Sequence, residues 1–218
     1  PKLIERIKAA DLVLLIGGRM SEIASQSYTL LGIPASAQQL VHIHPDPLEL
    51  GRVYQPILAI NATPPAFIAA LDGIEASPTW SANREAARAD YLAWSDTPPP
   101  VPGDFQYGDV MAWLRDRLPP DATICNGAGN FASWIHRYYR FRDFGTQLAP
   151  TSGSMGYGLP AGVMAKRQKP DSIALTIAGD GDFLMNGQEF ATAVHHGIPL
   201  IVVLIDNGIY GTIRMHQE

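Results

Sequence analysis

The sequence predicts an α/β protein made of two parallel-sheet units with helices on both faces. Short apolar runs alternate with helix-like segments along most of the 218 residues, which is the order of parallel strands joined by helical crossovers. Several apolar runs stop at polar, Gly-bearing segments, as strands do where the chain turns. A proline-rich stretch, residues 97–103, interrupts the alternation and is interpreted as the boundary between the units.

The first predicted unit covers residues 1–76. Its helices are expected at residues 3–10, 21–30 and 65–71, and its strands at 11–16, 39–43 and 58–60. The run at 11–16 is apolar after its first residue, which predicts a buried strand. Gly17 and Gly18 follow it but do not complete a G-x-G-x-x-G fingerprint. A bound nucleotide such as FAD is therefore an open but unsupported alternative to a purely structural role for this unit.

Residues 77–104 are predicted to link the units, with one helix at 81–94. The prolines of 97–103 lack N–H donors and resist helix formation, so this stretch should act as a semi-rigid spacer. The second unit is predicted at residues 105–218. Its helices are expected at 107–118, 131–139, 159–166 and 186–196, its strands at 122–125, 173–178 and 200–205, a long Gly/Ser loop at 148–158, and a further element from residue 210.

The strongest pattern is a predicted βαβ crossover. The apolar runs 173–178 and 200–205 end in Gly179-Asp180-Gly181 and Asp206-Asn207-Gly208, both interpreted as polar turns. Strands joined by one helix are expected to be parallel neighbours, and ligands of open α/β sheets bind where such strands end. Asp180 and Asn207 should therefore lie at one edge of the sheet.

These residue types indicate a metal-bridged diphosphate site. A carboxylate, an amide oxygen and a backbone carbonyl are hard donors that suit Mg²⁺ or Ca²⁺ and not zinc. Mg²⁺ is commonly held by one or two carboxylates together with phosphates and water. Gly181 opens a helical region whose backbone N–H groups can receive an anion. An ordinary crossover with Gly turns is the alternative.

Two segments resemble sequences of the thiamine diphosphate enzyme family, in its acetolactate synthase-like branch. They read GDGDFLMNGQEFATAV and, further along the chain, NGIYGTIRMHQE. The resemblance implies that Asp180, Asn207 and the backbone oxygen of Ile209 bind the metal. It also implies that residues 1–76 are part of a central, Rossmann-like domain. Residues 105–218 would then be the diphosphate side of the cofactor-binding domain, cut at its C-terminal end.

Residues Gly127 to Ala132 fit G-x-G-x-x-A after a strand, which taken alone is a dinucleotide fingerprint. A Rossmann interpretation needs an acid at the end of a following strand, and Asp143 has no strand pattern before it. The resemblance instead makes the backbone of Gly127, Ala128, Gly129 and Asn130 a phosphate-binding wall at a helix start. Asn130 could also cap that helix.

A second Gly-rich stretch contains Gly153, Ser154 and Met155. The resemblance implies that the Gly153 carbonyl accepts a hydrogen bond from the aminopyrimidine ring and that Met155 wedges the cofactor into a bent shape. A mobile Gly loop with a core Met is the alternative. The full set of expected cofactor-binding residues is Gly127, Ala128, Gly129, Asn130, Gly153, Ser154, Met155, Gly181, Asp182, Ile209 and Tyr210.

The function implied by the resemblance is an enzyme that uses thiamine diphosphate and Mg²⁺ on 2-oxo acids, first as a carboligase. A decarboxylase or C–C lyase of the same family is the alternative, and a non-catalytic cofactor-binding or oligomerisation module is another. No catalytic residue is expected within this sequence. The family's activating glutamate lies in another domain, usually from a partner subunit, and none of the seven glutamates here sits in a matching motif.

Charge, apolar content and cysteine count narrow the functions and locations that the sequence allows. A net charge of −5 gives no sign of nucleic-acid binding or of a basic membrane-binding patch, and no apolar run approaches a membrane span. The single cysteine, Cys125, excludes an internal disulfide framework and agrees with a cytoplasmic protein. Both ends of the sequence look cut, so an interior piece of a homodimeric or homotetrameric protein is expected.

Overall fold

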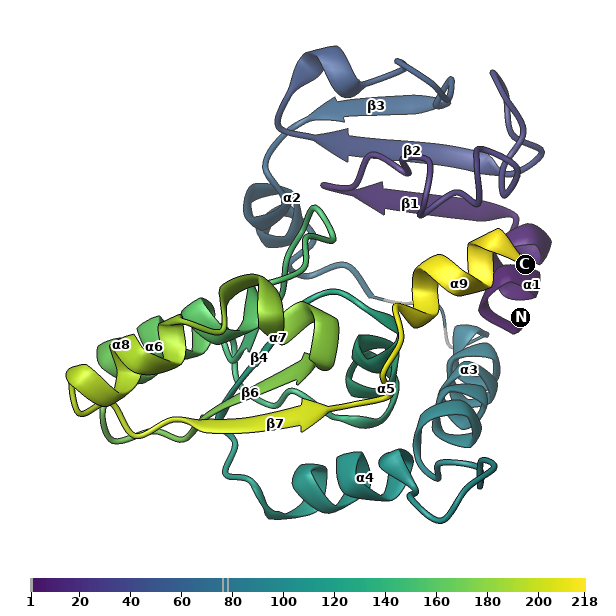
Figure 1. Cartoon of the computed structure of the whole chain (residues 1–218). Helices are drawn as coiled ribbons and strands as arrows, with labels where there is room; N and C mark the ends of the chain where they lie inside the picture. Colours follow the sequence, from purple (N-terminus) through teal and green to yellow (C-terminus); the bar gives the residue numbers. More distant parts are fainter. Residues whose placement is uncertain (1, 76, 78) are drawn as a thin grey trace. The chain divides into compact units, whose positions relative to one another are not determined.

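The computed structural model describes residues 2–75, 77 and 79–218. The predicted limits of the first unit, Pro1 and Ala76, lie outside the described residues. The chain forms two compact units, Pro1–Asp90 and Tyr91–Glu218, which divide within helix α3 (Trp80–Ser95). The predicted linker, residues 77–104, therefore contributes to both units. Each unit has its own sheet, and every strand pairing is parallel, which confirms the predicted fold class (Figure 1).

The first unit contains a three-stranded sheet in the order β1-β2-β3. Its elements are α1 (Lys2–Ala9), β1 (Leu12–Ile16), β2 (Gln39–His44), the 3-10 turn η1 (Pro47–Glu49), β3 (Leu58–Asn61) and α2 (Pro64–Ala70). Leu31, Leu40 and Tyr54 form its buried core. The prediction that β1 is buried is wrong: it is an edge strand, and Leu14 on its outward face is 50% exposed.

The helix predicted at 21–30 is also wrong, because the segment folds into irregular turns. Gln26, Ser27 and Tyr28 have φ values of 53°, 56° and 62°, in the left-handed region. The buried Ser25 hydroxyl accepts the Tyr28 N–H at 2.9 Å. A serine that bonds the local backbone in this way competes with helix hydrogen bonds.

The second unit contains a four-stranded sheet in the order β5-β4-β6-β7. Its elements are α4 (Tyr107–Arg117), β4 (Thr123–Asn126), α5 (Asn130–Tyr138), β5 (Gln147–Leu148), α6 (Gly158–Gln168), β6 (Ala174–Gly179), α7 (Asp180–Asn186), α8 (Glu189–His195), β7 (Ile201–Ile205) and α9 (Gly211–Gln217). Strands β6 and β7 are parallel neighbours, which confirms the predicted crossover.

Helices cover both faces of this sheet. Successive side chains of a strand point to opposite faces. Ile124 of β4 joins a core with side chains of α4 and α5, whereas Cys125 joins a second core with α6. Helix α8 packs on α6. The chain therefore turns to one face after β4 and to the other after β6, although these strands are adjacent. Such a switch opens a crevice at the strand ends, where ligands of open α/β sheets bind.

The crossover differs from its prediction in two details. Gly179 ends β6 and Asp180 begins α7, so the polar turn expected at 179–181 is not formed. An acidic residue in the first helical turn suits the helix dipole. The helix expected at 186–196 forms as the shorter α8, and an additional helix, α7, precedes it; the two are separated at Gly187 and Gln188, because glycine is a poor helix former.

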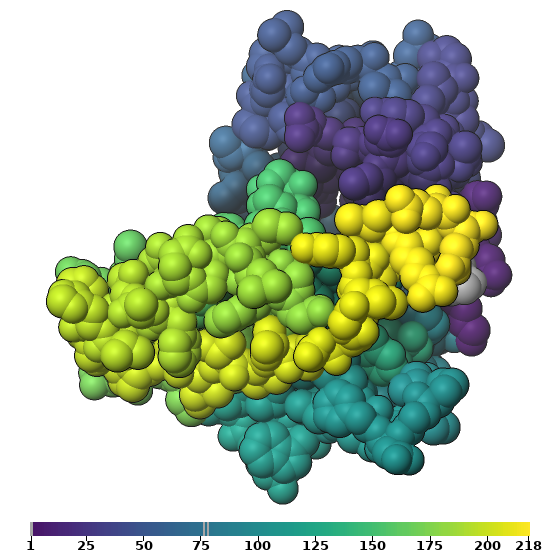
Figure 2. All heavy atoms as spheres, viewed as in Figure 1, coloured from purple at the N-terminus to yellow at the C-terminus, as the bar shows by residue number. Residues whose placement is uncertain are grey.

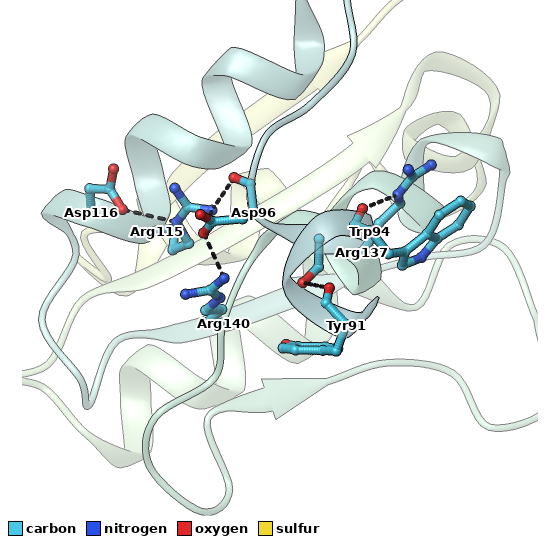
Figure 3. A network of polar contacts seen from close by, with 8 residues as sticks. Tyr91, Trp94, Asp96, Arg115, Asp116, Arg137 and Arg140 are labelled. Carbon is cyan, nitrogen blue, oxygen red and sulfur yellow. Dashed lines mark hydrogen bonds and ion pairs between the residues drawn. The ribbon is translucent and has the colours of Figure 1, made fainter. Parts of the chain in front are cut away.

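The start of the second unit is fastened by arginines (Figure 3). Asp96 accepts a hydrogen bond from Arg140 at 2.7 Å, and its backbone oxygen accepts one from Arg115 at 2.8 Å. Arg137 donates to the Trp94 carbonyl at 2.9 Å and lies over the Trp94 ring. The chain entering the proline run is thus held at several points.

The front face of the second unit in Figure 2 includes α7 and α8. Large apolar side chains are exposed on these two helices: Leu184, Met185, Phe190 and Val194. No helix among the described residues is long and apolar enough to cross a membrane.

Candidate functional site

A cavity of about 380 Å³ lies where β4, β6 and β7 end, within the second unit. Its lining comes from the segments after these strands, from the Gly-rich loop before α6 and from the start of α9. The lining residues are Ala128, Gly129, Asn130, Phe131, Gly153, Met155, Gly179, Asp180, Gly181, Asp182, Ile205, Asn207, Ile209, Tyr210, Gly211, Thr212 and Ile213. The position is the one that the strand order favours for a ligand.

Nearly all residues singled out in the sequence meet at this cavity. Two do not line it, Gly127 and Ser154. Six lining residues were not anticipated: Phe131, Gly179, Ile205, Gly211, Thr212 and Ile213. Gly179 and Ile205 are the last residues of their strands, so the end of an apolar run is the signal that could have found them.

The three expected metal ligands all border the cavity. The half-buried Asp180 carboxylate has no hydrogen-bond or ion-pair partner among the described residues. The Asn207 side-chain oxygen accepts the Ile209 N–H at 3.1 Å, and the Ile209 carbonyl accepts the Gly211 N–H at 3.0 Å. Each of these oxygens keeps a second lone pair.

Conventional metal clusters are absent from the part of the chain that the structure describes, since no three His, Cys, Asp or Glu side chains converge there. A cation at this cavity would therefore depend on the mixed set of one carboxylate, one amide oxygen and one carbonyl. That set is chemically suited to Mg²⁺, which prefers oxygen donors.

Asp182 differs from Asp180 because its side chain is buried, with the residue 3% exposed. Its Oδ1 accepts the N–H groups of Ala128, at 3.3 Å, and Gly156, at 2.7 Å. Burial raises the pKa of this carboxyl above its ordinary value, although the backbone hydrogen bonds act in the opposite direction. The Ala128 N–H, expected to face a phosphate, is thus taken up by Asp182.

Two glycines make room for this arrangement. A Cβ on Gly127 would overlap the Asp182 carboxylate. Gly156 has φ +82°, and a Cβ there would lie 2.7 Å from atoms of Met185 and Asn186. The Asn186 amide donates to the Gly156 carbonyl at 2.8 Å. Both polar backbone groups of Gly156 are therefore bound by α7.

The first residues of α5, α7 and α9 form the remaining walls of the cavity. Gly129 is the N-cap of α5, and the Asn130 side chain accepts a hydrogen bond from the Thr212 hydroxyl of α9 at 2.9 Å. Asn130 is thus the first residue of the helix, and no side chain caps it. A Cβ on Gly181 would lie 2.5 Å from the Tyr210 ring, which shows how closely that ring covers the start of α7.

Comparison with known proteins agrees with the geometry. The model of the thiamine pyrophosphate enzyme C-terminal TPP binding domain matches residues 127–218, and that of the thiamine pyrophosphate enzyme central domain matches residues 1–71. The first match begins at Gly127, one residue before Ala128, the first residue in the chain that lines the cavity. The two matches occur in one chain, and together they cover most of it.

Curated acetolactate synthases are similar along nearly the whole chain. The large subunit of Corynebacterium glutamicum is 30% identical over 220 residues, covering 97% of this chain and 34% of that protein. The large subunit of Parasynechococcus marenigrum is 29% identical, covering 97% of this chain and 34% of that protein. For the isozyme 2 large subunit of Escherichia coli the identity is 28%, with 97% and 38% covered.

The chain spans about a third of the length of these relatives. It carries two domains of one family, with the predicted pair of parallel sheets and a cavity at the strand ends of the C-terminal one. The chain therefore belongs to the thiamine pyrophosphate enzyme family, and it is distantly related to the acetolactate synthase large subunits.

Proposed function

We propose that this protein uses thiamine diphosphate and Mg²⁺ to act on 2-oxo acids as an acetolactate synthase-like carboligase. The observation that carries the proposal is that Asp180, Asn207 and Ile209 line one cavity together with the Gly-rich segments after β4 and before α6. The acetolactate synthases to which the chain is similar along 97% of its length support the choice of reaction.

The charge of the cavity supports a requirement for a divalent cation. No Lys or Arg occurs among the described residues that line it, while Asp180 and Asp182 do. A diphosphate carries several negative charges, and without a cation those charges would face a carboxylate across a partly dehydrated space. Mg²⁺ held by Asp180, Asn207 and the Ile209 carbonyl would turn this repulsion into attraction.

The other walls would bind and shape the cofactor. The start of α5 directs backbone N–H groups of Gly129 and Asn130 toward an anion. Half-buried Met155 and the apolar side chains of Phe131 and Ile213 would exclude water from the reacting end. When bound, the cofactor supplies an electron sink for carbanion chemistry beside a carbonyl group.

We further propose a homo-oligomer as the working form. No glutamate lines the cavity among the described residues, so the activating carboxylate of the proposed reaction would come from another domain of a partner subunit. The apolar side chains exposed on α7 and α8 support an interface, because a large apolar patch on a soluble protein commonly binds another protein surface.

The metal set gives the direct test. We expect Asp180→Ala in the full-length protein to abolish Mg²⁺-dependent binding of thiamine diphosphate in calorimetry, and Asn207→Ala to weaken it strongly. His195→Ala is the matched control, because this exposed side chain ends α8 away from the cavity. Unchanged affinity in Asp180→Ala would refute the metal site.

Cofactor binding without turnover of any 2-oxo acid would favour a non-catalytic module, and CO₂ release without carboligation would favour a decarboxylase.

A further inference from the structure

Asp182 joins two loops that are far apart in the sequence. Its Oδ1 accepts a hydrogen bond from Ala128, in the segment after β4, and another from Gly156, in the loop before α6. The same α7 helix provides Asn186, whose amide donates to the Gly156 carbonyl. Asp182 and Asn186 are four residues apart and therefore lie on one face of α7. One helix face thus holds both loops.

Each loop contributes a wall of the cavity. Ala128 is followed by Gly129 and Asn130, and Gly156 directly follows Met155. Gly156 is left-handed and closely packed, with no room for a Cβ, so it can occupy its place only as glycine. A shift at Asp182 would therefore move the wall that carries Met155 relative to the wall that begins α5.

We propose that Asp182 is a positioning residue that sets the spacing between these two walls through its Oδ1 acceptor. The carboxylate is buried against backbone N–H groups, and when ionised it has no proton to donate to a phosphate. Both N–H groups bond the same oxygen, so the link needs an acceptor at that point, and an uncharged side chain with an oxygen there can also supply one. The consequence for cofactor binding rests on the proposed function, whereas the link itself does not.

Two substitutions in the full-length protein test whether the link requires a hydrogen-bond acceptor or a negative charge at residue 182. Asp182→Ala removes the acceptor, and we expect affinity for thiamine diphosphate with Mg²⁺ to fall by about 10–100-fold, a loss of the size expected when a buried N–H group is left without its acceptor. Asp182→Asn keeps an oxygen in place, and we expect its affinity to stay within about threefold of the original protein. Asn186→Ala, which frees the Gly156 carbonyl and the exposed Gln188 side-chain amide, should give an intermediate loss. Glu189→Ala is the control, because it removes a carboxylate from the same crossover outside the cavity.

Amide hydrogen exchange without cofactor tests the link independently. We expect the N–H groups of Ala128 and Gly156 to exchange faster in Asp182→Ala and at the original rate in Asp182→Asn. If the original protein binds no cofactor, the proposed function fails, and the exchange pattern still decides the inference. Equal damage by Ala and Asn, in affinity or in exchange, would overturn it. Should Asp182→Ala not fold, Asp182→Asn still decides: an original exchange rate of the Ala128 and Gly156 N–H groups would support the acceptor link, and faster exchange would refute it.

Discussion

A single methyl group at residue 127 should damage the second unit severely. In Gly127→Ala the new Cβ overlaps the carboxylate of Asp182. Gly127 does not have a positive φ, so the effect is steric and not a matter of backbone conformation. The carboxylate must move away, and the hydrogen bonds from Ala128 and Gly156 break.

The magnitude follows from those two bonds. A buried N–H group left without its acceptor costs about 1–3 kcal/mol, so the two groups together cost about 2–6 kcal/mol. The alanine also stabilises the folded protein by about 0.4–1 kcal/mol, because it restricts the conformations of the unfolded chain. We therefore expect the free energy of unfolding to fall by about 1–5 kcal/mol, which is large beside the 5–15 kcal/mol typical of a folded protein.

Urea unfolding followed by tryptophan fluorescence measures the change, since Trp113 and Trp134 lie in the second unit. Gly211→Ala is the control, because a Cβ there would have its closest contact at 3.5 Å. The decisive comparison is Gly127→Ala in an Asp182→Ala background, where the methyl group has room and should change stability by less than about 1 kcal/mol. Effects that add within about 0.5 kcal/mol would refute the steric explanation.

Three further outcomes are expected. Because burial raises the pKa of Asp182, the folded protein binds a proton there that the unfolded chain releases, so this stabilisation is present at low pH and lost as pH rises through the folded pKa. The free energy of unfolding should therefore decrease relative to Asp182→Asn as pH rises above about 4, and a parallel pair of pH profiles would contradict this. Burial also raises the pKa of the Cys125 thiol to about 12, so iodoacetamide at pH 8 should alkylate it only in urea; rapid labelling of the native protein would show that the strand is open. Met155→Ala should lower turnover more than cofactor affinity, because it removes shape and not ligands, and weaker binding with normal turnover at saturating cofactor would count against the wedge.

The parts of the fold that depend on local pattern could be predicted from the sequence. The apolar runs that became β6 and β7, with a helical segment between them, place Asp180 and Asn207 at the strand ends without any tertiary information. The segment 21–30 could not be predicted, because three left-handed residues and a buried Ser25 override its helical pattern.

The contacts of Asp182 could not be predicted from the sequence either. Its partners Ala128 and Gly156 are distant in sequence, and the space that admits the carboxylate is the missing side chain of Gly127. A glycine reads the same in a sequence whether it serves a turn, a ligand or a neighbouring side chain. Only the three-dimensional arrangement separates these uses.

The strand order β5-β4-β6-β7 has a kinetic consequence. Thr123 pairs with Ala174, so joining β4 to β6 closes a loop of about 50 residues, which costs about 3 kcal/mol of chain entropy before the contacts form. The cavity is lined by residues from the ends of β4, β6 and β7, so a ligand can bind there only when these three strands are in place. A ligand at 100 times its Kd would add about 2.7 kcal/mol to that form alone. Under the proposed function, a cell short of cofactor would keep more newly made chain incompletely assembled and open to proteases, so the vitamin supply would control the amount of protein as well as its activity.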